Sequence, residues 1–346
     1  QQQTVALKAP GFLCINTQDS PTELPISYAA VAENCVIDRL GRLATRKGLS
    51  QVTTNHQVIS TVPAEPEYLT CSGTFSADGG TVYILCGNER EIFNQEPDGT
   101  LTSLTLPGAI TAGDWQIESF NNKAYLVQKD HIPLVFDPAD PTQVSYVAQA
   151  PSVGFNAPTC MTSGFGHVFH AGYAAFPSLI HWSDLGDGTA WNGSTAGSID
   201  VGYFWPNNYD KIIALHVHNN FLVIFGENSI LVYQVPTDGA GPATIVGPAA
   251  MTLEDTVSGM GCISRDSVKS VGTDVFFMDN TGLRALGRTI QEKSLPIGDI
   301  SRNVRTDIKN AIAASTTRKN TIKSFYDPDE SAFIVFMPDS GSTYVF

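Results

Sequence analysis

The sequence predicts an all-β protein, and more specifically a β-propeller of six blades built from antiparallel meanders. A pair of short apolar strands joined by a turn rich in Gly, Asn or Asp recurs six times along the 346 residues. The turns follow one another at intervals of 42 to 58 residues. Four-stranded blades need a period of this size, because each blade buries its faces only against its neighbours. A sandwich or barrel is the alternative, although either rarely contains six near-equivalent meanders.

The predicted hairpins can be placed one by one. Their turns lie at residues 78–80, 121–122, 164–166, 219–220, 272–274 and 328–330. A third strand follows four of these hairpins, at residues 91–94, 134–136, 229–233 and 282–286. The sequence ends at residues 344–346 inside a predicted strand. We therefore expect either that this strand closes the ring of blades or that the gene product continues beyond Phe346.

One helix interrupts the predicted strands. Val304, Ile308 and Ile312 recur every four residues and form one apolar stripe, which indicates a helix over residues 302–314 with Ser301 as its N-cap. We expect this helix to pack across a blade edge.

The chain is expected to divide into an N-terminal segment, residues 1–60, and the propeller, residues 61–346. In the N-terminal segment the pattern predicts a short helix over residues 26–32, capped by Ser27. A basic hairpin should follow, with strands at residues 34–38 and 42–46 around a turn at 39–41.

Charge is distributed unevenly along the chain, whose net charge is −14. Residues 51–286 hold 7 Lys or Arg against 23 Asp or Glu, whereas the two ends together hold 13 basic and 11 acidic residues. Because Lys and Arg supply most of the affinity for nucleic acid, the acidic body is a poor surface for binding DNA tightly. Charged residues are only 16% of the chain, against roughly 25% in an average domain. This deficit favours a protein that packs against neighbours.

The six cysteines show no metal-binding or redox spacing, and four of them (Cys71, Cys86, Cys160 and Cys262) lie in apolar runs typical of buried free cysteines. No apolar run reaches the ~18 residues of a membrane span. We therefore expect a protein without a membrane span that folds in the cytoplasm.

Three stretches of the sequence carry a resemblance to a known family. They are residues 16–48, with NTQDSPTELP and AENCVIDRLGRLATRKG, residues 179–191, LIHWSDLGDGTAW, and residues 222–230, LVIFGENSI. In this order they resemble the tail nozzle proteins of short-tailed bacteriophages, also called packaged-DNA stabilisation or tail tubular proteins. The match is weak after residue 290.

The resemblance implies a structural role in the virion tail. It implies a homo-oligomeric ring of six copies below the portal and its adaptor, with tail fibre or spike proteins as further neighbours. Genome DNA would leave through the central conduit, and the ring would help to retain packaged DNA before infection. Folding would take place in the cytoplasm of the host bacterium.

Four basic residues of the N-terminal hairpin are candidates for the contact between subunits: Arg39, Arg42, Arg46 and Lys47. They could contact DNA instead, as could the basic residues between Arg288 and Lys323. We favour subunit contacts, because basic ends and an acidic body are complementary in a ring, and complementary charge sets the register of assemblies.

The stretch from Ser183 to Trp191 approaches the Asp-box of sialidase-like propellers, but Leu185 occupies the position where that motif needs Asp. Asp184 and Asp187 are better explained as turn residues that accept backbone N–H bonds, with Trp182 and Trp191 packed between blades. A carbohydrate-binding or glycan-hydrolysing propeller for host-surface recognition remains the alternative function.

Other candidate sites have simpler explanations. His216 and His218 share one face of a predicted strand, without an evident third metal ligand. His167 and His170 face opposite ways. The run from Asp279 to Gly282 lacks the downstream acidic ligands of a calcium loop, and reads as a hairpin turn. No nucleophile elbow, phosphate loop or dinucleotide fingerprint occurs. We therefore expect no enzymatic activity, no catalytic residue, no metal and no cofactor.

Overall fold

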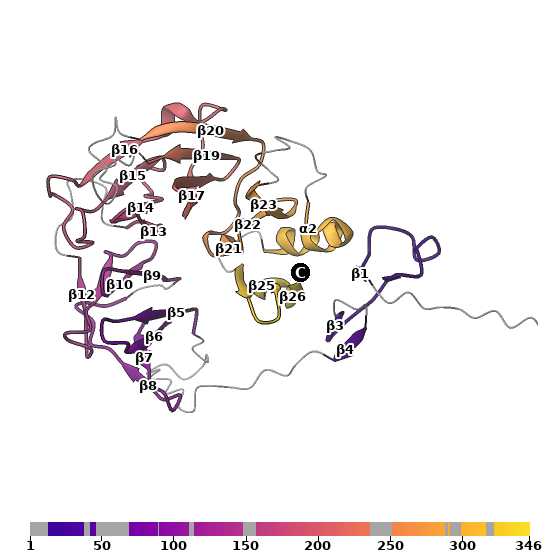
Figure 1. Cartoon of the computed structure of the whole chain (residues 1–346), viewed down its shortest axis with the longest axis horizontal. Helices are drawn as coiled ribbons and strands as arrows, with labels where there is room; N and C mark the ends of the chain where they lie inside the picture. Colours follow the sequence, from indigo (N-terminus) through magenta and orange to yellow (C-terminus); the bar gives the residue numbers. More distant parts are fainter. Residues whose placement is uncertain are drawn as a thin grey trace, which may run out of the picture.

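A computed structural model gives the structure of the chain. It describes residues 13–37, 42–45, 69–88, 90–110, 114–147, 157–235, 251–287, 290, 299–315 and 322–346. Six antiparallel sheets stand around a common axis, each following the previous one along the chain (Figure 1). The six-bladed propeller predicted from the sequence is confirmed.

Blades 1 to 4 are four-stranded meanders whose strands pair in chain order. Blade 1 contains β5 (Cys71–Ser76), β6 (Val82–Gly87), β7 (Ile92–Gln95) and β8 (Leu101–Ser103), and blade 2 contains β9 (Gln116–Phe120), β10 (Lys123–Val127), β11 (Leu134–Phe136) and β12 (Val144–Tyr146). Blade 3 contains β13 (Cys160–Gly164), β14 (His167–Ala171), β15 (Leu179–Trp182) and β16 (Gly197–Asp200), and blade 4 contains β17 (Ile212–His218), β18 (Phe221–Gly226), β19 (Ser229–Gln234) and β20 (Thr252–Ser258).

Blades 5 and 6 have three strands each among the described residues. They are β21 (Lys269–Val271), β22 (Asp274–Asp279) and β23 (Gly282–Ala285), then β24 (Lys323–Asp327), β25 (Ala332–Met337) and β26 (Ser342–Val345). The last of these confirms the strand predicted at the end of the sequence. In every blade the first two strands are joined at the turn that the sequence predicted.

The turns explain why the hairpins form where they do. Asn121 and Asn122 both adopt positive φ (41° and 60°), and Asn219 and Asn220 do the same (47° and 64°). Asn accepts this left-handed conformation more readily than most residues, and two such residues in succession make the turn whose twist suits a two-residue hairpin.

The hydrophobic core lies between the blades. Five clusters of buried side chains join successive blades, from blades 1 and 2 around to blades 5 and 6. Trp182 packs between blades 3 and 4, and Trp191 between blades 2 and 3, as predicted. Among the described residues no such cluster joins blade 6 to blade 1.

The predicted helix near residues 302–314 is confirmed. A 3-10 turn, η5 (Arg302–Val304), leads into α2 (Arg305–Ala314), which buries Ile308, Ala311 and Ile312 against blades 5 and 6. The predicted N-cap is wrong. The Ser301 hydroxyl donates to Asp299 Oδ1 (2.5 Å) and accepts the N–H of Leu283 (2.9 Å). Ser301 therefore ties the helix to blade 5 rather than capping it.

The N-terminal segment forms an arm attached to α2. Its strands β1 (Cys14–Ile15) and β2 (Tyr28–Ala29) pair in parallel, and β3 (Cys35–Ile37) and β4 (Leu43–Thr45) form the predicted hairpin. The helix predicted over residues 26–32 is wrong, because Tyr28 and Ala29 pair with β1 and fix the backbone in an extended form. The Thr17 hydroxyl donates to Asp307 Oδ2 (2.6 Å), and the hydroxyl of Thr306 donates to Gln18 Oε1 (2.9 Å). No helix among the described residues has the length and apolar character that crossing a membrane requires.

Candidate functional site: a charged cluster on the propeller axis

Only Arg42 of the four basic residues predicted at the subunit contact lies within the described residues. It is exposed and directly precedes β4. Arg39, Arg46 and Lys47 lie outside the described residues. The predicted pairing of the two strands of this hairpin is present, with Cys35 opposite Thr45 and Ile37 opposite Leu43.

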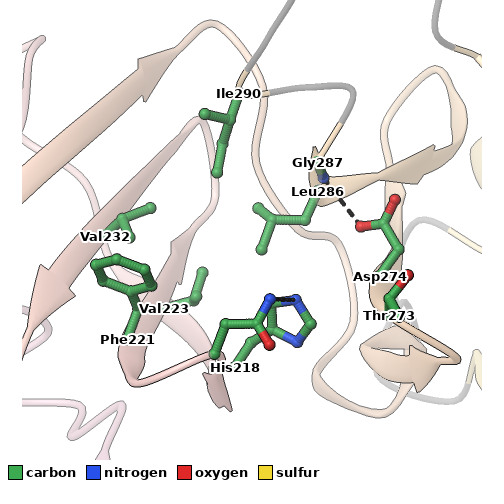
Figure 2. A pocket seen from close by; sticks show the side chains of 10 residues that line it. His218, Phe221, Val223, Val232, Thr273, Asp274, Leu286, Gly287 and Ile290 are labelled. Atoms are coloured by element: carbon green, nitrogen blue, oxygen red, sulfur yellow. Dashed lines mark hydrogen bonds between the residues drawn. The ribbon is translucent and has the colours of Figure 1, made fainter.

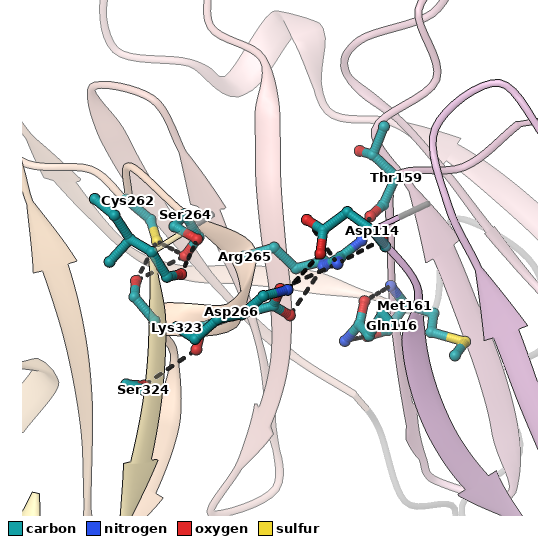
Figure 3. A network of polar contacts seen from close by, with 12 residues as sticks. Asp114, Gln116, Thr159, Met161, Cys262, Ser264, Arg265, Asp266, Lys323 and Ser324 are labelled. Carbon is teal, nitrogen blue, oxygen red and sulfur yellow. Dashed lines mark hydrogen bonds and ion pairs between the residues drawn. The ribbon is translucent and has the colours of Figure 1, made fainter. Parts of the chain in front are cut away.

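A cluster of charged residues occupies the propeller axis, and sequence reasoning did not find it. We call Asp114, Thr159, Arg265, Asp266 and Lys323 the axial cluster. Figure 3 shows how they converge. Asp114 and Thr159 precede the innermost strands of blades 2 and 3, Arg265 and Asp266 lie on η3 (Arg265–Ser267) at the start of blade 5, and Lys323 begins blade 6. Residues from four blades can meet in this way only at the centre of the ring.

Arg265 is the centre of the axial cluster, with a side chain only 10% exposed. Its Nη1 donates to the Thr159 carbonyl (2.6 Å), and its Nη2 donates to the Asp114 carbonyl (2.9 Å). Nε and Nη2 also donate to the two carboxylate oxygens of Asp266 (3.0 and 3.1 Å). The planar guanidinium thus uses its fixed fork of donors to link three blades.

Lys323 completes the axial cluster. Its ammonium group forms ion pairs with the carboxylates of both Asp114 and Asp266. Burial alone would raise the pKa of Asp266, but the charges of Arg265 and Lys323 hold it well below the ordinary value. Burial likewise opposes the charge on Lys323, and the two carboxylates nevertheless raise its pKa. Asp266 and Lys323 therefore keep their charges at neutral pH.

Polar contacts also join the innermost strands of blades 2 and 3. The side chain of Gln116 donates to the Met161 carbonyl and accepts the N–H of Met161, both at 2.8 Å. The Ser163 hydroxyl donates to Glu118 Oε1 (2.9 Å), and burial raises the pKa of Glu118. The axis is thus lined by groups that bond to one another.

The axial cluster has the properties of a structural ion-pair network. General acid–base catalysis works best with a group whose pKa lies near the operating pH. Here the carboxylate pKa of Asp266 is lowered and the ammonium pKa of Lys323 is raised, so both move away from neutrality. The cluster balances two cationic side chains with two anionic ones and holds the starts of the blades together.

A cavity of about 260 Å³ lies between blades 4 and 5 (Figure 2). Its walls are mainly apolar, and its polar rim is already engaged. Asp274 Oδ1 accepts the N–H groups of Val275 (2.7 Å) and Gly287 (2.9 Å), and His218 Nε2 lies 3.0 Å from Asn219 Nδ2. The lining residues are His218, Asn219, Phe221, Val223, Val232, Thr273, Asp274, Leu286, Gly287 and Ile290. This volume lies below the usual range for small-molecule sites.

The histidines singled out in the sequence lie on two different strands, β14 and β17. His216 Nε2 lies 2.9 Å from Ser270 Oγ in blade 5, and burial lowers its pKa to about 4, whereas His218 lines the cavity. His167 and His170 point to opposite sides of β14 as predicted, towards Phe169 and Trp191 respectively. Throughout the described ranges, no three His, Cys, Asp or Glu side chains gather as metal ligands.

The interpretation of residues 183–191 as a turn is confirmed. Asp184 Oδ1 accepts the N–H of Thr195 (3.0 Å), and Asp187 Oδ1 accepts the N–H (2.8 Å) and hydroxyl (2.6 Å) of Thr189. Hydrogen bonding by the Thr195 hydroxyl lowers the pKa of Asp184. The run from Asp279 to Gly282 is a hairpin turn as predicted, in which Asp279 Oδ2 accepts the hydroxyl of Thr281 (2.6 Å).

No family model matches the chain, and no curated protein matches it. Among solved structures the chain is similar to the extracellular domain of a hybrid two-component system from B. thetaiotaomicron, with a TM-score of 0.49 and 12% identity over 90% of this chain. It spans 37% of the length of that chain. It is also similar to a streptogramin B lyase (TM-score 0.48, 10% identity, 83% of this chain and 84% of that one). A virginiamycin B lyase from Staphylococcus aureus gives a TM-score of 0.46 at 10% identity, over 90% of this chain and 86% of the lyase. Similarity at this level says nothing about the activity or partners of this chain.

Proposed function

We propose that the chain is a structural subunit of a phage tail nozzle. Copies of it form a ring, six by the family resemblance, around a conduit through which genome DNA leaves, and the ring helps to retain packaged DNA. Its neighbours in the virion tail are the portal adaptor and fibre or spike proteins. The observation that carries this proposal is the N-terminal arm, which places a basic hairpin outside an acidic propeller.

The arm is built to reach beyond its own subunit. Its base is fixed on α2 through Thr17 and Gln18, while β3 and β4 lie outside the ring of blades, beyond blade 6 (Figure 1). The hairpin carries Arg42, and the stretch from residue 51 to 286, which contains blades 1 to 5, has a net charge of −16, from 7 basic and 23 acidic residues. A basic element facing outward and an acidic body are complementary between copies, and repeated head-to-tail contacts of this kind generate rings.

The three stretches that resemble nozzle proteins fall in two different environments. Residues 179–191 and 222–230 contain strands β15 and β18, whose buried side chains form the cores around blades 3 and 4. These stretches support a shared fold. Residues 16–48 contain the arm, and this stretch supports a shared mode of assembly.

The test is to image the purified full-length chain by negative-stain microscopy and to measure its association by sedimentation velocity. We expect closed rings. Arg42→Glu should weaken ring assembly, because it reverses a charge that faces an acidic neighbour. Lys129→Glu reverses a lysine that is 75% exposed in blade 2 and serves as the matched control. A chain that stays monomeric at every concentration would contradict the proposal, and normal rings of Arg42→Glu with altered DNA retention would assign the hairpin to DNA.

A further inference from the structure

A cavity of about 320 Å³ lies between blades 1 and 2, which are neighbours in Figure 1, towards their outer strands. We call it the outer pocket. Its lining includes Tyr83, Asn94, Glu96 and Thr102 of blade 1 and Pro141 and Thr142 of blade 2. Unlike the cavity between blades 4 and 5, it falls within the range of volumes that small-molecule sites occupy.

The strand register places the lining side chains of blade 1 on one face of the sheet. Asn94 is paired with Leu85 on one side and with Thr102 on the other. Leu85 belongs to the apolar core shared with blade 2, so Asn94 and Thr102 also face blade 2. Tyr83 precedes Leu85 by two residues and shares its face. Glu96 follows Asn94 by two residues and does the same.

The outer pocket is preformed, because contacts between the two blades fix it at both ends. At the rim, the N–H of Thr105 donates to the Thr142 carbonyl (2.9 Å). Towards the core, the Tyr83 ring packs on Phe75 and Phe136, with centroids 5.9 and 5.1 Å away. A site that is ordered before binding loses little conformational entropy when its ligand enters.

Asn94 gives the outer pocket an acceptor without a partner. Its Nδ2 donates to Glu96 Oε1 (3.0 Å), which fixes the orientation of the amide. Its Oδ1 is buried and accepts no hydrogen bond from any described residue. A buried acceptor without a partner costs free energy, so the outer pocket favours a ligand that donates a hydrogen bond to Asn94.

The charge of the lining selects a neutral ligand. Glu96 is the one charged side chain among the described residues that line the outer pocket, so the lining supplies no cation to hold a phosphate or carboxylate group. An ammonium or guanidinium group is favoured by several carboxylates or by free aromatic faces. Here there is a single carboxylate, and the Tyr83 ring is already packed by two other rings.

A sugar ring matches the remaining chemistry. Its hydroxyl groups can donate to Asn94 Oδ1 and to the Glu96 carboxylate, and they can accept a hydrogen bond from the Thr102 hydroxyl. Its C–H groups can pack on the apolar ring of Pro141. Thr102 and Pro141 are exposed at the mouth of the outer pocket, so a polysaccharide can place one unit inside while its chain continues into solvent.

We infer that the outer pocket binds one sugar unit of a neutral polysaccharide. This inference goes beyond the proposed function and does not depend on it. In a ring, each copy contributes one outer pocket. A weak affinity for a single sugar unit then becomes firm attachment to a surface coated with polysaccharide, because several linked sites bind together.

The first test is saturation-transfer difference NMR of the full-length chain with the methyl glycosides of glucose, galactose, mannose, rhamnose and N-acetylglucosamine at millimolar concentration. We expect transfer to at least one glycoside. Asn94→Leu should bind that glycoside at least roughly tenfold more weakly, because it lacks the acceptor. Gln95→Leu is the matched control, since Gln95 is the next residue of β7 and points to the opposite face. No transfer to any of these glycosides, or equal binding by Asn94→Leu, would overturn the inference.

The second test is thermal unfolding, which separates ligand binding from structure. Asn94→Leu removes a buried acceptor that has no partner, and half-buried Glu96 can replace its lost hydrogen bond with water. The melting temperature of the ligand-free variant should therefore not fall below that of the wild type. The glycoside should raise the melting temperature of the wild type and of Gln95→Leu, but not that of Asn94→Leu. An Asn94→Leu variant that melts well below the wild type would assign Asn94 to the stability of the blade and contradict the inference.

Charged probes and the state of assembly complete the set of outcomes. Binding of putrescine or of methyl phosphate, but of no glycoside, would assign the outer pocket to a charged ligand and refute the inference. A chain that stays monomeric and binds a glycoside through Asn94 supports this inference and contradicts the nozzle proposal. Rings that bind no glycoside do the reverse.

Discussion

At the scale of single residues, the axial cluster shows how few charges can matter in an acidic protein. Only 7 of the 236 residues from 51 to 286 are Lys or Arg, and one of them, Arg265, has its guanidinium bonded across three blades. Sequence reasoning missed Arg265 because Thr159 and Asp114, whose carbonyl groups it contacts, lie 106 and 151 positions away. Lys323 was missed for the same reason, since its partner Asp114 lies 209 positions away. The one available signal was that each member lies just before, or at, the first strand of a blade.

Lys323→Met should destabilise the protein by about 2 kcal/mol, because it leaves two partly buried carboxylates with Arg265 as their shared cation. Urea unfolding followed by tryptophan fluorescence measures this loss. Lys129→Met is the control, since its ion pair with Asp130 is exposed and long (3.9 Å), and its loss should cost less than about 0.5 kcal/mol. Equal stabilities of the two variants would show that the cluster does not fasten the blades.

The buried histidines of blade 3 predict sensitivity to acid. His170 lies opposite His181 across β14 and β15, its ring stacks on Trp191 with centroids 4.3 Å apart, and burial lowers its pKa to about 3. An unfolded histidine titrates near pH 6.5, so the unfolded chain binds the proton first as the pH falls. Stability from neutral His170 is present above about pH 6.5 and is lost progressively towards pH 3.

His170→Phe should therefore flatten the fall of the free energy of unfolding between about pH 6.5 and pH 4, since phenylalanine can stack on Trp191 without taking up a proton. Each unit of pKa difference between the folded and unfolded chain corresponds to about 1.4 kcal/mol. His218→Gln, in the less buried cavity rim, serves as the control. An unchanged slope in His170→Phe would place the acid sensitivity elsewhere.

At the scale of elements, the hairpins were predictable and the outer strands were not. Each hairpin turn has at least one residue with positive φ, and a largely apolar strand follows it, so both features can be recognised locally in the sequence. The fourth strands β8, β12 and β16 are short, and many of their residues are exposed or half-buried, so their sequences carry no apolar pattern. The helix at 26–32 was predicted from local propensity, and pairing with β1 overrides that propensity.

The β9–β10 turn links two blades and can be tested at one residue. Asn122 has a φ of 60°, and its side-chain oxygen accepts the N–H of Asp78 in blade 1 (2.6 Å). Asn122→Gly should keep the backbone conformation but lose the hydrogen bond to Asp78, which should lower the free energy of unfolding by about 1 kcal/mol. Asn122→Val adds the cost of a left-handed β-branched residue, about 1–2 kcal/mol more.

The melting temperature should be highest for the wild type, lower for Asn122→Gly and lowest for Asn122→Val. Asn220→Gly, at the equivalent turn of blade 4 with a φ of 64°, should lose less than Asn122→Gly. If both glycine variants lost the same stability, the link between blades 1 and 2 would have no energetic role.

At the scale of the whole molecule, the junction of blade 6 with blade 1, which we call the seam, differs from the other junctions between blades. Five apolar clusters join blades 1 to 6 in succession, and within the described part of the chain the junction of blade 6 with blade 1 has no such cluster. Near that junction Lys323 of blade 6 reaches across the axis to Asp114, at the start of blade 2.

Hydrogen exchange should therefore be fastest at the seam, because regions with few buried apolar contacts open at the lowest free energy. We expect the amides of β24 and β5 to exchange before those of β13 and β18. Lys323→Met should accelerate exchange in β24 and β5 and leave β18 nearly unchanged. Uniform protection of all six blades would show that the seam is as stable as the apolar junctions.

The axial cluster also affects where the DNA conduit of the proposed ring can lie. Arg265 is bonded to Asp114, Thr159 and Asp266 on the subunit's own axis, where the starts of three blades meet. In the proposed ring, the conduit is therefore enclosed by the copies together and does not run along the axis of any one copy. Its width follows from the number of copies and the angle at which neighbours meet.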